Sequence, residues 1–171
     1  MSEFSRIVDL RGITLAPERL EATAEECLAL ARRFAIVSVQ RLSATIALEK
    51  DGAVVMANGT LSAAFVQSCA VSGEDLPMTV DEPIQLRFVP ENGPSRPDEE
   101  IELDESDCDE IPYSGTAFDL GEAVAQSLAL AIDPYATGPN ADAARKAAGI
   151  VSEGATGPFA ALAALKGGKS D

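Results

Sequence analysis

Residues 36–67 decide the fold, and they read IVSVQRLSATIALEKDGAVVMANGTLSAAFVQ. In the first half of this stretch, every second position is apolar, as shown by Leu42, Ala44, Ile46 and Leu48. This alternation predicts a long strand with one buried face, because successive side chains of a strand point to opposite sides. The Asp-Gly step at 51–52 then provides a tight turn, so the stretch predicts a β-hairpin.

More extended chain follows the hairpin turn. The return strand is expected from Ala53 to about Gln67, with Asn58-Gly59 as a bulge or second turn. After a loop at 71–77, a further pair of extended segments ending at Pro90 is predicted from alternating apolar residues, namely Met78, Val80, Ile84, Leu86 and Phe88. These strands are joined by turns that leave no room for crossover helices, so the sheet should be mainly antiparallel.

Helices are predicted on both sides of the strand-rich region. Thr23 and Glu26 form a capping-box pattern that begins a helix over 24–34. Asp119, with Glu122 three residues later, predicts the start of a second helix that stops before Pro134. Weaker helices are expected at 142–148 and 158–166. The predicted fold class is α+β: a mainly antiparallel sheet of hairpins with two or three packed helices and a flexible C-terminal tail.

Charge is concentrated in one part of the chain. The 171 residues carry 28 acidic and 13 basic side chains, a formal net charge of -15, and no Lys or Arg occurs between Arg96 and Arg145. Residues 91–110 form an acidic loop with too little apolar surface to fold alone. Its carboxylates are assigned to binding a basic partner: Asp98, Glu99, Glu100, Glu102, Asp104, Glu105, Asp107, Asp109 and Glu110.

The length favours one domain with a C-terminal extension. We assign residues 1–134, including the acidic loop, to an α+β domain and residues 135–171 to a flexible extension that carries the short terminal helix. The negative balance disfavours nucleic acid and anionic membranes as direct partners, because phosphate groups attract Lys and Arg. Arg32-Arg33 with Arg41, and Arg145-Lys146, are the local exceptions, although Arg32 and Arg33 are also the cations that suit the end of a helix.

The chain offers little for catalysis or metal binding. It has no His, which removes the commonest general base and metal ligand. Its three cysteines, Cys27, Cys69 and Cys108, are odd in number and widely spaced, which favours a reducing cytoplasmic environment over a disulfide framework. We expect no enzyme activity, cofactor or metal. The alternative is a metal-dependent hydrolase or nuclease acting on precursor RNA with carboxylates such as Asp104, Asp107 and Asp109.

Three separated stretches resemble one family. They are Gly59-Thr-Leu-Ser-Ala-Ala-Phe-Val-Gln-Ser-Cys69 with Val71-Ser-Gly-Glu-Asp-Leu-Pro77, then Phe118-Asp-Leu-Gly-Glu-Ala-Val-Ala-Gln-Ser-Leu-Ala-Leu-Ala-Ile-Asp-Pro134, and Gly157-Pro-Phe-Ala-Ala-Leu-Ala-Ala-Leu-Lys166. In this order they are similar to the DUF177/YceD family. The resemblance implies a non-enzymatic role in accumulation or processing of large-subunit ribosomal RNA, through contacts with a basic ribosomal or assembly protein.

The chain departs from the family pattern at the cysteine loop. Many relatives carry Cys-x-x-Cys there, which is half of a zinc site, whereas here Cys69 is followed by Ala70, Val71 and Ser72. A structural zinc is therefore not expected, and Cys69 is interpreted as a small residue at a strand end.

The C-terminal stretch is the second predicted partner-binding element. Three apolar residues spaced three apart would share one edge of a short helix, followed by a basic residue: Phe159, Leu162, Leu165 and Lys166. An isolated helix this short is marginal in water. The segment therefore either packs on its own sheet or, as we predict, serves as an anchor for a partner.

Overall fold

The computed structural model describes residues 2–91 and 109–150. Their contacts form two compact units, and each is described by itself. Of the described residues, the first comprises 2–67, 77–91 and 109–133, and the second 68–76 and 134–150. The domain division expected from the sequence stays a prediction.

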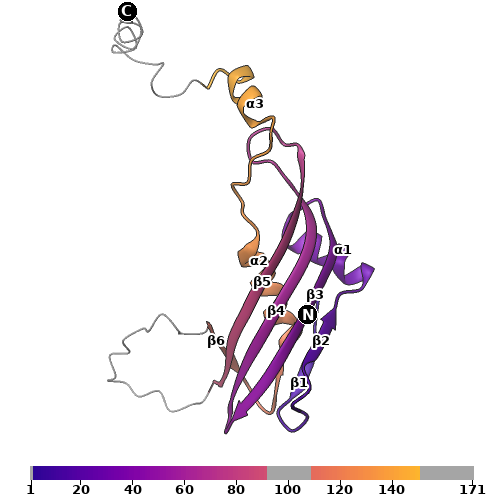
Figure 1. Cartoon of the computed structure of the whole chain (residues 1–171), viewed down its shortest axis with the longest axis vertical. Helices are drawn as coiled ribbons and strands as arrows, with labels where there is room; N and C mark the ends of the chain where they lie inside the picture. The colour runs from indigo at the N-terminus through magenta and orange to yellow at the C-terminus, as the bar shows by residue number, and fades with distance from the viewer. Residues whose placement is uncertain (1, 92–108, 151–171) are drawn as a thin grey trace, which may run out of the picture. The chain divides into compact units, whose positions relative to one another are not determined.

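The first unit is built on a five-stranded sheet with the order β2-β3-β4-β5-β6 (Figure 1). The pairs β2–β3 and β3–β4 are antiparallel, and β5–β6 is parallel. The strands are β2 (Glu18–Glu21), β3 (Ser38–Asp51), β4 (Val54–Ser68), β5 (Asp75–Pro90) and β6 (Asp109–Tyr113). A second, two-stranded antiparallel sheet pairs β1 (Ile7–Asp9) with β7 (Ala117–Asp119).

The predicted hairpin is confirmed as β3 and β4, which pair down to Asp51 and Val54. Gly52 lies in the turn with φ 62°, a conformation that L side chains rarely adopt. The expectation of a bulge or turn at Asn58-Gly59 is wrong, because β4 runs through it and Gly59 pairs with Ile46. A Cβ on Gly59 would lie 2.0 Å from the Thr45 carbonyl oxygen, so this glycine allows two backbones to approach closely.

The pair of extended segments expected before Pro90 is a single strand, β5. Its inward residues Ile84, Leu86 and Phe88 are buried, whereas residues 81–83 are exposed without ending the strand. The acidic loop is also shorter than expected, because Asp109 and Glu110 begin β6. The rest of that loop, residues 92–108, lies outside the described residues.

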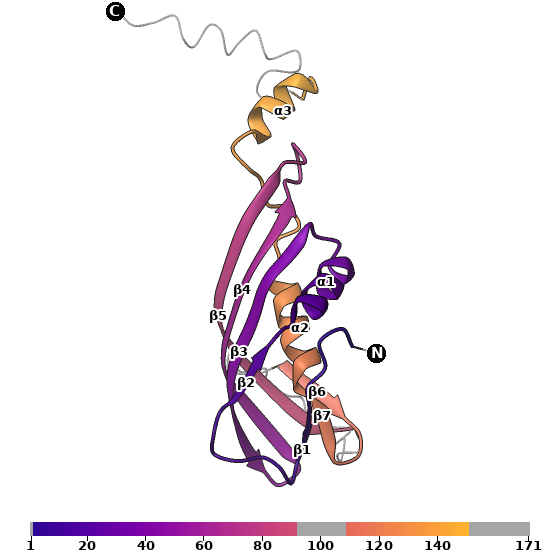
Figure 2. The ribbon, with the colours of Figure 1, turned by 90° about the vertical axis from the view of Figure 1, so that its right-hand side faces the viewer.

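Two helices of the first unit cover the same face of the sheet (Figure 2). They are α1 (Ala24–Arg33) and α2 (Leu120–Ala131), as predicted. The capping box is formed, since the Thr23 side chain accepts from the Glu26 amide and the Glu26 carboxylate accepts from the Thr23 amide. The weaker helix is confirmed as α3 (Ala141–Ala147) in the second unit. The terminal helix predicted at 158–166 lies outside the described residues.

The core lies between the helices and the sheet. Its largest fully buried side chains include Phe4, Phe65 and Phe88, and Leu30 of α1 and Leu128 of α2 are also inaccessible to solvent. Phe88 and Phe118 stack with their ring centroids 4.1 Å apart. In the parts of the chain that the structure describes, no helix has the length and apolar character needed to span a bilayer. The α+β class predicted from the sequence is therefore confirmed.

Candidate functional site

The residues predicted to bind a partner lie mostly outside the described residues. This holds for the acidic residues from Asp98 to Asp107 and for Phe159, Leu162, Leu165 and Lys166. Of the two remaining carboxylates, Glu110 is exposed and its Oε1 lies 2.8 Å from Nη1 of Arg87. Asp109 is placed at the start of β6. The structure therefore leaves the predicted partner-binding set untested.

The start of α2 holds the N-terminal residues in place. One Asp119 carboxylate oxygen accepts from the amides of Glu122, at 3.1 Å, and Arg6, at 2.8 Å. Its other oxygen accepts from the Ser5 hydroxyl at 2.6 Å. The Leu120 amide in turn donates to the Arg6 carbonyl at 3.0 Å. Asp119 thus caps the helix and also binds residues that precede it by more than 100 positions.

Gly121 belongs to the same arrangement. A Cβ at this position would lie 2.5 Å from the Phe4 carbonyl oxygen and 2.7 Å from the Arg6 nitrogen. The N-terminal backbone therefore crosses the first turn of α2 where only glycine leaves room. The stretch Phe118-Asp-Leu-Gly-Glu122 is explained as a structural clamp.

Two arginines hold the first unit together through carboxylates. Arg33 contacts Glu122 with both terminal nitrogens, at 2.6 and 2.8 Å, and Glu3 at 2.9 Å. Arg6 contacts both oxygens of Glu26, at 2.7 and 3.0 Å. Hydrogen bonds from these arginines lower the pKa of Glu122 and of Glu26 to about 2. Both carboxylates are ionised and paired at neutral pH, which suits a structural role rather than proton transfer.

The second unit contains Cys69 in a tight loop. The buried Cys69 sulfur accepts from the amides of Val71, at 3.4 Å, and of Ser72 and Gly138, both at 3.3 Å. Hydrogen bonds from Ser72, followed by the Gly138 amide, lower the pKa of the Cys69 thiol to about 6. Gly73, with φ 73°, completes the turn. Cys69 therefore joins two segments of the second unit as a hydrogen-bond acceptor, and the same hydrogen bonds favour its thiolate form.

Glu74 makes the second connection within this unit. Its carboxylate accepts from the Asn140 amide at 3.0 Å, the Asn140 side chain at 2.6 Å and the Ser72 hydroxyl at 3.0 Å. The backbone contact to Asn140 is the main cause of a lowered Glu74 pKa. Within residues 2–91 and 109–150, no group of three or more His, Cys, Asp or Glu side chains is placed to hold a metal ion. The donors around Cys69 do not fit a zinc site, since Ser72 stands where a second thiolate would be needed.

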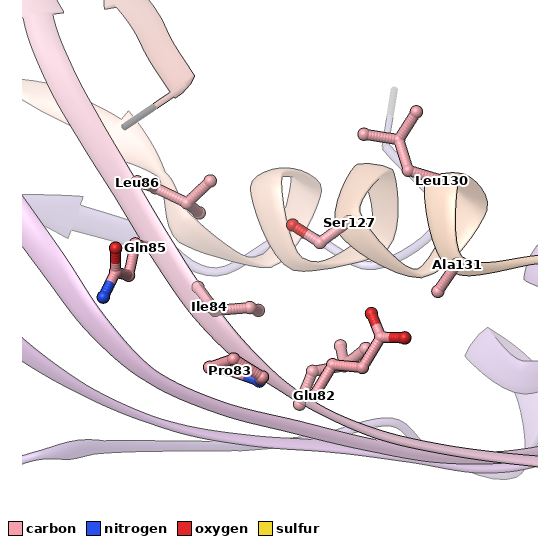
Figure 3. A pocket seen from close by; sticks show the side chains of 9 residues that line it. Glu82, Pro83, Ile84, Gln85, Leu86, Ser127, Leu130 and Ala131 are labelled. Carbon is pink, nitrogen blue, oxygen red and sulfur yellow. The ribbon is translucent and has the colours of Figure 1, made fainter. Parts of the chain in front are cut away.

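A cavity of the first unit lies between α2 and β5, with a volume of about 520 Å³. Its β5 side is formed by residues 82–86 and its α2 side by Ser127, Leu130 and Ala131 (Figure 3). The Glu82 carboxylate points toward the last turn of α2. Leu130 is 81% exposed, although Leu128 on the same helix is fully buried. The site is a groove with a mixed polar and apolar lining, and one carboxylate lies at its side.

A family model described as "large ribosomal RNA subunit accumulation protein YceD" matches residues 57–166. The chain belongs to the YceD family. The match begins within β4, contains all three stretches from which the resemblance was drawn, and confirms it. No curated protein and no solved structure matches the chain.

The groove lies in the part of the chain that matches the family model, since Glu82 and Leu130 both fall within residues 57–166. Sequence reasoning missed these two residues. The signals were present: Glu82 interrupts the inward apolar series between Val80 and Ile84, and Leu130 lies beside the helical stripe that contains Leu128. Neither residue stands out in the sequence, because a single exposed Leu or Glu is common on protein surfaces. They indicate a site only after the helix and the strand have brought them close together.

Proposed function

We propose that this protein is a non-enzymatic factor that supports accumulation of large-subunit ribosomal RNA through contacts with a basic protein. The observation that carries the proposal is the match to the YceD family model over residues 57–166. The net charge of -15 supports a basic protein as the partner, because ribosomal RNA is itself an anion.

The local basic clusters, which could otherwise bind RNA phosphates directly, are largely engaged in contacts within the protein. Three of the five arginines and lysines in the local basic clusters contact other protein groups. Arg33 pairs with Glu122 and Glu3, Arg41 donates to the Ser62 hydroxyl at 3.2 Å, and Arg145 contacts Asp142 at 2.8 Å. Arg33 in particular has a structural role at the end of α1, so direct contact with phosphates is disfavoured.

The test is deletion of the gene followed by measurement of mature large-subunit ribosomal RNA relative to small-subunit RNA. We expect the ratio to fall, and expression of the wild-type protein to restore it. Unchanged RNA ratios and unchanged subunit profiles would contradict the proposal.

A parallel assay addresses the enzymatic alternative. Purified protein is incubated with precursor RNA and Mg²⁺, and we expect no cleavage. Cleavage that is lost when Asp104, Asp107 and Asp109 are changed to alanine would favour a nuclease. A filter-binding titration of RNA against salt should likewise show weak binding, since direct contact with phosphates predicts strong binding at low salt that falls steeply as salt rises.

A further inference from the structure

The groove between α2 and β5 extends along the helix. A second cavity of about 330 Å³ shares Leu86, Ser127 and Leu130 with the cavity of about 520 Å³, and a third of about 320 Å³ shares Ile111, Ala123 and Gln126 with the second. All three lie within the first unit. Together they form a continuous seam along the side of α2, with Leu130 as its most exposed large apolar side chain.

The charged side chains that line this seam are all carboxylates. They are Glu82, Glu110, Asp119 and Glu122, and no Lys or Arg from residues 2–91 or 109–150 lines any of the three cavities. Glu110 is paired with Arg87, Asp119 caps α2, and Glu122 is paired with Arg33. Glu82 has no partner among the described residues. A carboxylate without a partner in the described part of the chain thus lies at the Leu130 end of the seam.

The last turn of α2 adds to the negative potential at Glu82. A helix carries partial negative charge at its C-terminus, and Lys or Arg in the last turn commonly offsets it. The last turn of α2 contains no basic residue. Figure 3 shows the Glu82 carboxylate directed toward this turn, and no Lys or Arg of the described residues lines the cavity between them. A cationic side chain fits there by charge.

The edge of β5 argues against binding by strand addition. β6 pairs only with Leu86–Pro90, so residues 77–85 lack a partner strand on that side among the described residues. Proline has no amide hydrogen and is tolerated in a sheet only where its nitrogen faces away from the ladder. Pro77 and Pro83 are six residues apart and therefore face the same edge, which we assign to the side away from β4. A partner strand would lack two donors there.

We propose that this seam binds a basic, apolar segment of a partner protein through its side chains. A Lys or Arg of the segment contacts Glu82 and the end of α2, and an aliphatic or aromatic side chain packs against Leu130. A second copy of this strongly acidic chain, or an RNA, would bring like charge to the seam. The inference rests on the proposed role as a protein-binding factor and specifies the surface and the chemistry of the partner.

The test uses the full chain and a fluorescein-labelled peptide, Lys-Leu-Lys-Phe-Lys-Leu-Lys, followed by fluorescence anisotropy. We expect Leu130→Ser and Glu82→Lys each to weaken binding about tenfold or more, as expected for a central contact. The matched controls are Leu15→Ser, at a leucine that is 100% exposed, and Glu49→Lys, on an exposed position of β3. Both should bind within about twofold of wild type.

Two further peptides define the mode of binding. A peptide with Glu in place of Lys should fail to bind. A peptide with methylated backbone nitrogens at alternate positions should bind as well as the original, because side chains make the contacts. Loss of binding on methylation would show strand addition and overturn the proposed mode.

Equal weakening by Glu49→Lys would show that the attraction is nonspecific and would overturn the site. Self-association that Leu130→Ser abolishes would assign the seam to a second copy and also overturn the proposal. Failure here is distinguishable from failure of the proposed function. The peptide assay does not depend on ribosomal RNA levels, and the deletion assay does not depend on the groove.

Discussion

The two helices that cover the same face of the sheet, α1 and α2, differ in the charge and exposure of the residues at their C-terminal ends. α1 has a complete capping box, and its last turn contains Arg32 and Arg33, of which Arg33 also binds Glu122 and Glu3. α2 is capped at its start by Asp119, but its last turn has no cation, exposes Leu130 and faces the Glu82 carboxylate. Described cations therefore offset the negative end of α1, whereas the last turn of α2 has no cation of its own and leaves Leu130 exposed.

The largest expected difference is between two leucines of α2. Leu128→Ala should lower the free energy of unfolding by about 2–5 kcal/mol, because it removes a fully buried side chain and leaves a cavity. Leu130→Ala should change it by less than about 0.5 kcal/mol, because that side chain is 81% exposed. Urea unfolding measures both. A large stability loss for Leu130→Ala would show that this residue belongs to the core.

The start of α2 gives the next effect. Gly121→Ala should cost about 1–3 kcal/mol, since its new methyl group would push against the backbone of Phe4 and Arg6. Gly12→Ala is the matched control, because the nearest atom to its Cβ would be the Asp9 carbonyl oxygen at 3.5 Å, an ordinary contact. Equal urea midpoints for the two variants would mean that the N-terminal residues do not cross α2 as described.

Removing the ion pair between Arg33 of α1 and Glu122 of α2 should have a smaller effect on stability, and this effect should depend on pH. Glu122→Gln should cost about 1 kcal/mol at neutral pH, because the contact with Arg33 is partly exposed. The pKa of Glu122 is lowered to about 2, so its stabilisation is complete above the ordinary value of 4.5 and is lost as pH falls toward 2. The stability difference between wild type and Glu122→Gln should therefore shrink between pH 5 and pH 2. A constant difference would contradict the pairing.

The smallest expected effect is a difference in thiolate absorbance between variants of the two described cysteines, Cys27 and Cys69. Burial raises the pKa of the Cys27 thiol in α1, whereas hydrogen bonds lower that of Cys69 to about 6. Thiolate absorbance at pH 7.5 should therefore decrease in Cys69→Ser and remain in Cys27→Ser. Since the folded state favours the Cys69 thiolate, its contribution to stability should grow from pH 6 toward pH 9. The opposite assignment of the absorbance would refute the Cys69 environment.

Local sequence patterns predicted the elements that local forces determine. The alternation and the Asp-Gly turn predicted β3 and β4, and Thr23 with Glu26 predicted α1. The pair of segments predicted from Met78, Val80, Ile84, Leu86 and Phe88 is instead the single strand β5. The strand continues because Pro83 needs only an edge without a ladder hydrogen bond, which is a property of the sheet and not of the local sequence.

Contacts between distant residues could not be predicted. No local pattern connects β1 with β7, the Cys69 sulfur with the Gly138 amide, or Gly59 with the backbone of Thr45. The groove shares this property, since Glu82 and Leu130 meet only after the sheet and α2 have packed. The sequence therefore indicated the family and the fold class, and the candidate site became visible only in the assembled structure.

The clamp at Asp119 also has a consequence for the order of folding during synthesis. Ser5 and Arg6 are synthesised 113 or more residues before Asp119, their hydrogen-bond acceptor. Contacts between residues so far apart in sequence form slowly, because most of the chain must be ordered before they close. Phe4 is fully buried in the folded chain, so its final packing beside the start of α2 cannot form before α2 has been synthesised.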